Sequence, residues 1–367
     1  GIGYMAFFNC ADLTSVSIPN TVTIIRDFAF QWCTGMTSVF IPSSVSEIGN
    51  RAFECCTSLT SITIPNSVTE IGESAFSGCS SLTSLTIPDS VTEIKQSTFN
   101  GCSGLTSLTI PNSVTEIKKS AFQYCGLTSV TIPNSVTKIG EYAFSGCTDL
   151  TSITIPNSVT EIGEAAFEDC SSLTSLTIPN SVTEIKQSTF KGCSGLTSFS
   201  IPNSITKIGG SAFMFCGSLT SITIPNSVTE IGEFAFTFCG SLTSVSIPNS
   251  VTKIGGSAFY SCSGLTSVTI PNSVTEIGLT VFADCTDLTE IIVQDGNPNY
   301  ASENGVLFNL NKTKLIEYPN GKEIEYTIPN SVVEIGQYAF YYCAELISVT
   351  IPASVTKIGQ YAFWGCI

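Results

Sequence analysis

Residues Leu59–Ser81 read LTSITIPNSVTEIGESAFSGCSS, and most of the chain repeats this stretch. Close copies stand at Leu150–Ser172 and Leu219–Ser241, and the copies follow one another in steps of 23 residues. A fixed period of this length is typical of a solenoid, in which each repeat forms one coil that cannot bury its apolar face alone. The period therefore predicts an elongated stack of coils.

Two columns of residues set the register of the repeats. Proline and cysteine both recur every 23 residues, with the same two irregularities. One residue is missing between Cys125 and Leu127, and the step from Pro271 to Pro329 is 35 residues too long. We predict one solenoid domain over 1–367, with regular repeats at 1–287, an irregular repeat with an insertion at 288–345 and a last repeat at 346–367. Because the chain begins within a repeat, we also expect it to be part of a longer polypeptide.

The spacing within one repeat predicts its local structure. Ile62 and Ile64 alternate with Ser61 and Thr63, a pattern that indicates a short strand with isoleucine inward. The Pro65–Asn66–Ser67 segment predicts a turn, because proline cannot continue the ladder. Ala75, Phe76 and Cys79 follow at helical spacing and predict a short helical or 3-10 turn. The expected fold is an α/β solenoid of 23-residue coils, each with one short parallel strand.

The long step contains a different pattern. Residues Val306–Leu310 and Lys314–Tyr318 alternate on either side of Asn311–Lys312–Thr313, which predicts a β-hairpin insertion. Pro319–Lys322 predicts a second turn. Inserted loops carry function more often than the scaffold does, so we expect contacts to a partner at Asn311, Lys312 and Tyr318.

Composition excludes several classes of function. The net charge is −15, from 14 Lys+Arg against 29 Asp+Glu, which disfavours nucleic acid and anionic membranes as partners. No apolar run reaches the ~18 residues that span a bilayer, so we expect no membrane insertion. The absence of histidine removes the usual triads and the commonest metal ligand. We therefore predict no enzyme activity, no catalytic residues, no metal and no cofactor.

Two further columns, of cysteine and of glutamate, carry groups that could form disulfides or bind a cation. The cysteines could form disulfides, but they share a face with phenylalanine and isoleucine, and we expect buried thiols with only Cys55, beside the column, accessible. The glutamates from Glu47 to Glu184 could share a cation, but exposed carboxylates usually stay solvated.

The outward strand positions form two files of hydroxyls, which suit a shallow surface for a protein or an extended polymer. A repetitive face offers no convergent pocket for a small ligand. Strand propensity and solubility would explain the same residues without any binding. The candidate ligand-facing positions are Ser61, Thr63, Ser84, Thr86, Ser107, Thr109, Ser129, Thr131, Ser152 and Thr154.

The motif IPNSVTEIGESAF-x-x-C-x-x-L resembles the BspA-like family of leucine-rich repeats over essentially the whole chain. The resemblance implies a secreted or surface-displayed protein that adheres to host or matrix proteins or to other cells. We take non-enzymatic adhesion at the cell surface as the leading hypothesis. A structural subunit of an extracellular filament or coat, formed by self-association, is the alternative, and an ice-binding surface is a third.

Overall fold

The computed structural model describes residues 1–366. The chain divides into two compact units, unit 1 at Gly1–Val182 and unit 2 at Thr183–Ile367. The expectation that they act as one domain stays a prediction.

Most regular coils contain two short strands rather than the single strand we expected, and the coil that begins at Leu173 has only the second, β15 at Glu184–Ile185. In the coil quoted above, β5 at Ser61–Thr63 lies between β3 and β7, and β6 at Glu70–Ile71 pairs with β4. All these pairings are parallel, with partners one coil apart. The predicted inward and outward pattern is confirmed, since Ile62 is buried while its two neighbours are exposed. The turn after Pro65 is confirmed by the bond from the Val68 N–H to the Pro65 carbonyl.

The predicted helical turn is wrong. Within residues 1–366 there is no helix, and Gly72–Cys79 forms consecutive turns. The N–H groups of Ala75, Ser77 and Cys79 donate to carbonyls three residues back, whereas those of Ser74, Phe76 and Gly78 donate to the next coil. Ser74 and Gly78 have positive φ angles of 53° and 73°, and a left-handed residue at every fourth position prevents a helix. The fold is therefore an all-β solenoid, not an α/β one.

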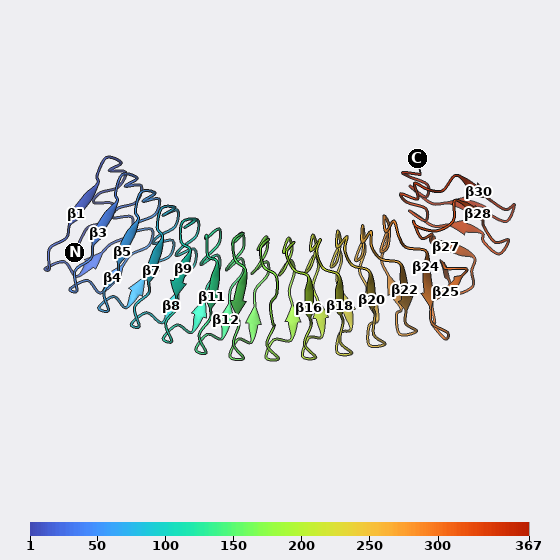
Figure 1. Cartoon of the computed structure of the whole chain (residues 1–367), viewed down its shortest axis with the longest axis horizontal. Helices are drawn as coiled ribbons and strands as arrows, with labels where there is room; N and C mark the ends of the chain where they lie inside the picture. Colours follow the sequence, from blue (N-terminus) through green and yellow to red (C-terminus); the bar gives the residue numbers. More distant parts are fainter. Residues whose placement is uncertain (367) are drawn as a thin grey trace. The chain divides into compact units, whose positions relative to one another are not determined.

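In unit 1 the first strands of the coils form two sheets, β1-β3-β5-β7-β9 and β11-β13, and the second strands form β2-β4-β6 and β8-β10-β12-β14. Figure 1 shows β1 to β9 following one another coil by coil. The first strands are β1 (Ser15–Ser17), β3 (Ser38–Phe40), β5 (Ser61–Thr63), β7 (Ser84–Thr86), β9 (Ser107–Thr109), β11 (Ser129–Thr131) and β13 (Ser152–Thr154). The second strands are β2 (Ile24–Ile25), β4 (Glu47–Ile48), β6 (Glu70–Ile71), β8 (Glu93–Ile94), β10 (Glu116–Ile117), β12 (Lys138–Ile139) and β14 (Glu161–Ile162).

In unit 2 the sheets are β16-β18-β20, β22-β24, β28-β30, β15-β17-β19-β21-β23 and β25-β26-β27-β29-β31. The first strands are β16 (Ser198–Ser200), β18 (Ser221–Thr223), β20 (Ser244–Ser246), β22 (Ser267–Ile270), β24 (Glu290–Val293), β28 (Glu325–Thr327) and β30 (Ser348–Thr350). The second strands are β15 (Glu184–Ile185), β17 (Lys207–Ile208), β19 (Glu230–Ile231), β21 (Lys253–Ile254), β23 (Glu276–Ile277), β29 (Glu334–Ile335) and β31 (Lys357–Ile358). The insertion adds β25 (Tyr300–Glu303), β26 (Val306–Asn309) and β27 (Lys314–Glu317).

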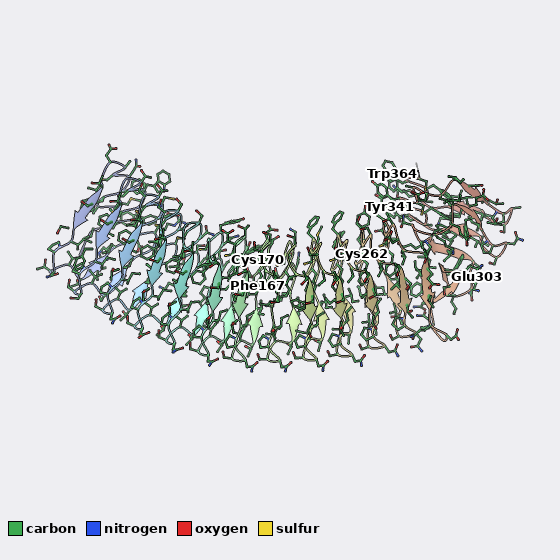
Figure 2. The ribbon with its side chains drawn as sticks, in the orientation of Figure 1. Phe167, Cys170, Cys262, Glu303, Tyr341 and Trp364 are labelled. Atoms are coloured by element: carbon green, nitrogen blue, oxygen red, sulfur yellow. The ribbon has the colours of Figure 1, made fainter. Side chains whose placement is uncertain are left out.

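The core of each unit is a file of phenylalanine rings beside a file of cysteines. In unit 1 the rings from Phe30 to Phe167 are stacked, with neighbouring centroids 5.2 to 5.7 Å apart. Figure 2 labels Phe167 and Cys170 on the same coil. The thiol of Cys79 donates to the Phe53 carbonyl one coil back, 3.2 Å away, and the same bond recurs along the column. The cysteine is thus both a small apolar residue and a weak donor for a buried carbonyl.

The coil with the missing residue interrupts one ladder. Gly126 stands at the shortened position, and a side chain there would place its Cβ 2.1 Å from the Ser103 carbonyl oxygen. Only glycine fits this close approach. The first strands on either side, β9 and β11, belong to different sheets, whereas β10 and β12 remain paired.

The predicted hairpin is confirmed. Strands β26 and β27 are antiparallel, β25 adds a third antiparallel strand that we did not predict, and β27 joins the second-strand column through β29. The turn at Pro319–Lys322 is also confirmed, by a bond from the Lys322 N–H to the Pro319 carbonyl.

Glu317 replaces a backbone acceptor at the insertion. In the preceding coil the Phe259 N–H donates to the Val281 carbonyl of the next coil. No regular coil follows the coil of Phe282. The Phe282 N–H therefore donates to the Glu317 carboxyl oxygen, at 2.9 Å. Glu317 is buried, and burial raises its pKa from 4.5 to about 7.

Candidate binding surface

The hydroxyls chosen from the sequence form one continuous face of unit 1. They stand at both ends of β5, β7, β9, β11 and β13, with a buried or half-buried apolar residue between each pair. The structure brings together and exposes all ten: Ser61, Thr63, Ser84, Thr86, Ser107, Thr109, Ser129, Thr131, Ser152 and Thr154.

Neighbouring threonines show how this face differs from the scaffold. The hydroxyls of Thr60, Thr83 and Thr151 donate to threonine carbonyls one coil back, at 3.0 to 3.4 Å. Among the described residues, none of the ten strand hydroxyls makes such a bond. Their hydrogen-bonding capacity is therefore free for a partner or for water.

Two open depressions lie on this face. One of about 790 Å³ covers β9, β11 and β13 and reaches the Pro-Asn turns that follow them. The other, of about 390 Å³, covers β5, β7 and β9. The larger one lies where the short coil interrupts the ladder, and Leu108 at its floor is partly exposed. Hydroxyl rims over an apolar floor suit an extended chain better than a compact small molecule.

The glutamate column is largely matched by lysines. Lys118 contacts Glu93 at 2.7 Å and Glu116 at 2.5 Å, and Lys138 contacts Glu161 at 2.8 Å. Exposed pairs of this kind contribute little to stability but relieve the repulsion between stacked carboxylates. In the described chain, no group of three or more His, Cys, Asp or Glu side chains could hold a metal ion.

The thiols fall into two groups. Ladder cysteines such as Cys56, Cys79 and Cys102 are fully buried, and burial raises the pKa of Cys79 well above its usual range. Cys55 is half-buried, and burial together with the Glu54 carboxylate raises its pKa. The expectation that Cys55 alone is accessible is wrong, because Cys10 is exposed and Cys366 is partly exposed.

Native labelling with iodoacetamide should therefore modify Cys10, Cys55 and Cys366 and spare the buried cysteine column, because the reactive thiolate must be accessible and burial raises the pKa of column thiols such as Cys79 well above the usual range. Peptide mass spectrometry before and after denaturation measures the sites. The variant Cys55→Ser is the control and should lose one native label. Modification of Cys79 at the rate of Cys55 would contradict this assignment.

The insertion contacts chosen from the sequence lie in different environments. Asn311 is exposed at the hairpin tip, and Lys312 is partly exposed and pairs with Glu303 at 2.7 Å. Tyr318 is 2% exposed, its hydroxyl donates to the Glu323 carbonyl, and its ring stacks on Phe340 at 5.0 Å. Tyr318 thus belongs to the core of unit 2 and offers no contact surface.

Sequence reasoning missed a set of exposed aromatic residues on the outer turns of unit 2. Phe215 and Phe238 are 42% and 39% exposed, stack at 4.8 Å, and have positive φ angles of 63° and 61°. The equivalent residue Gly78 shows that other coils use glycine there, and a left-handed non-glycine residue costs roughly 1–2 kcal/mol. Aromatic residues in the column where other coils carry Gly78, Gly101 and Gly146 were the signal that could have found them. Figure 2 labels Tyr341 and Trp364, two further aromatic residues of unit 2.

Parallel coils of 23 residues, stacked through phenylalanine and cysteine files, define a repeat protein of the solenoid class. The sequence model of the BspA type leucine rich repeat region, described with 6 copies, matches residues 1–127, 115–232, 206–325 and 318–367. The chain therefore belongs to the BspA type leucine-rich repeat family. No curated protein sequence matches it.

Solved structures agree with this assignment. A leucine rich cell surface protein from Faecalibacterium prausnitzii is 37% identical, with a TM-score of 0.55 over 77% of this chain and 79% of its own. A leucine-rich repeat protein from Bacteroides ovatus is 28% identical, with a TM-score of 0.58 over 96% of this chain and 85% of its own. The described residues contain no helix long and apolar enough to cross a membrane.

Proposed function

We propose that this chain is a non-enzymatic, surface-displayed or secreted recognition protein that adheres to host or matrix proteins or to other cells. Family membership and the cell-surface relative from F. prausnitzii support the class. The contact surface we propose is the hydroxyl face of unit 1, together with the insertion tip at Asn311 and Lys312.

The proposal depends on one observation: some hydroxyls form hydrogen bonds between coils of the described chain, and the hydroxyls of the strand face do not. Threonines such as Thr60 use their hydroxyls to join coils, whereas Ser61 and Thr63 beside it leave theirs free on an exposed strand. The free hydroxyls rim depressions that follow the strands from coil to coil. An extended partner could therefore form the same contact repeatedly, and many weak contacts add up when they are linked.

Surface plasmon resonance on immobilised fibronectin, fibrinogen and mucin tests the proposal. We expect binding to at least one of them, and a loss of roughly tenfold or more in the double variant Thr109→Glu/Thr131→Glu, because the added carboxylates fill the larger depression. Ser80→Glu and Ser103→Glu add the same charge at exposed sites off the face and should bind normally. The proposal would be overturned if the chain bound none of the three proteins. It would also be overturned if the control variants lost as much affinity as the double variant.

A further inference from the structure

One column of the strand face changes its chemistry at the insertion. Each first strand of a coil begins at an outward position, and from Ser15 to Ser348 this residue is serine in all these strands but two. Glutamate replaces it only at Glu290 in β24 and Glu325 in β28, the two strands on either side of the insertion. Both side chains are exposed.

The two glutamates line the same open depression of about 690 Å³, which Glu323 and Lys322 also line. We call this depression the acidic slot. Within the described chain, Glu290, Glu323 and Glu325 take part in no ion pair, although nearby Glu303 and Glu334 are both matched by lysines. The acidic slot therefore carries carboxylates that the chain itself does not neutralise.

The two strands beside the acidic slot differ in how their backbone edges are paired. On the β24 side, the Ile291 N–H donates to the Gly305 carbonyl at 2.8 Å, so the turn between β25 and β26 covers that strand. On the other side, β28 pairs with β30 alone among the described strands, and Figure 1 shows these two strands next to each other. One edge of β28 is thus available for another strand.

The acidic slot suits a chain of spaced positive charges better than a single ion. No set of three or more carboxylates or thiols in residues 1–366 lies close enough to hold a metal. An extended peptide that adds to a strand edge gives main-chain hydrogen bonds and places alternate side chains on one side. Lysine or arginine at alternate positions would then meet the carboxylates.

We propose that the acidic slot binds an extended, lysine- or arginine-rich segment of a partner protein, which adds to β28 as a strand and pairs with Glu290, Glu323 and Glu325. The site lies in unit 2 and does not depend on the hydroxyl face of unit 1.

Fluorescence anisotropy with a labelled Lys-Thr-Lys-Val-Lys-Thr-Lys peptide tests the proposal on the full chain. We expect binding that weakens with salt, and a loss of roughly tenfold or more in Glu290→Ser/Glu325→Ser, because screening and charge removal act on the same contacts. Serine is the residue that the other strands carry, so the double variant should fold normally. The matched control is Glu345→Ser, which removes an exposed carboxylate outside the acidic slot and should bind as the parent does.

A second peptide with N-methyl groups along one backbone edge separates strand addition from charge attraction. We expect it to bind at least several-fold more weakly, since it cannot form the ladder. Equal affinity for both peptides would overturn strand addition. No binding of the lysine peptide beyond that of a glutamate counterpart, or unchanged binding by the double variant, would overturn the acidic slot as a basic-peptide site.

Discussion

Replacing Phe76 with alanine should lower the free energy of unfolding of unit 1 by about 3–5 kcal/mol, the usual cost of a cavity left by a buried aromatic ring. The Phe76 side chain is fully buried, and its ring stacks between Phe53 at 5.5 Å and Phe99 at 5.7 Å. The loss reaches both neighbouring coils, because each coil of a solenoid is stabilised by the coils next to it. Urea unfolding measures the total effect, and hydrogen exchange shows which coils open.

The matched control for this prediction is Ser77→Ala, which changes the next residue at a half-buried position where other coils carry asparagine or glutamine. It should shift stability by less than about 1 kcal/mol, as surface substitutions usually do. If the two variants unfolded at the same urea concentration, the ring file would not be the main stabilising contact of unit 1. A uniform rise in exchange along unit 1 would contradict the local origin of the effect.

Replacing Glu317 with glutamine should remove a pH dependence from the stability of unit 2. The pKa of Glu317 is raised by burial from 4.5 to about 7, so the folded state binds a proton that the unfolded state has already lost in that interval. The free energy of unfolding then falls as pH rises from 4.5 to 7, and the fall is about 3 kcal/mol at 1.36 kcal/mol for each unit of pKa. Glutamine keeps the acceptor for the Phe282 N–H without the charge, so the variant should be the more stable protein at pH 8.

Urea unfolding of parent and variant at several pH values between 4 and 8 measures this effect as the difference between two curves. The difference isolates one group, since the other carboxylates titrate alike in both proteins. Glu317→Ala should be less stable than the glutamine variant at every pH, because it leaves the Phe282 N–H unpaired at a cost of about 1–3 kcal/mol. Parallel curves for parent and Glu317→Gln would show that Glu317 is not buried as described.

Much of the fold followed from spacing. Residues that always alternate, such as Ser61 and Ile62, predicted the strand and its two faces, and the fixed prolines predicted the turns. The hairpin followed from the same alternation at β26 and β27. These features depend on local periodicity, which one sequence is enough to reveal.

The conformation of the outer turns, such as Gly72–Cys79, could not be predicted from local periodicity. Ala75, Phe76 and Cys79 point inward at helical spacing, but the backbone between them alternates between bonds within the coil and bonds to the next one. Serine, tyrosine and phenylalanine all occupy its left-handed positions, so the usual glycine signal is weak. Tertiary pairing between coils decided the conformation there.

The candidate site was predictable only in part. Exposure of the strand hydroxyls followed from alternation, but Thr60 and Ser61 carry the same chemical group, and only the contact to the preceding coil shows which one is occupied. The prediction for Tyr318 was wrong because tyrosine is intermediate in its tendency to be buried, and its place beside a turn does not decide between surface and core. The sequence does not show that Glu317 accepts from the Phe282 N–H, or that Glu290 and Glu325 line one depression. Both facts depend on how the insertion lies against the neighbouring coils.

The hydrogen bonds between coils of unit 1 have a consequence for how such genes can change length. A coil such as Leu59–Ser81 donates from Ser74, Phe76 and Gly78 to the following coil and accepts the equivalent donors of the preceding one. Recombination that deletes or duplicates one whole period would join two ends that already match. A fractional deletion would misalign every donor, unless it falls where the chain tolerates a glycine such as Gly126. Array length in this family can therefore drift in whole periods while each remaining coil keeps its bonds.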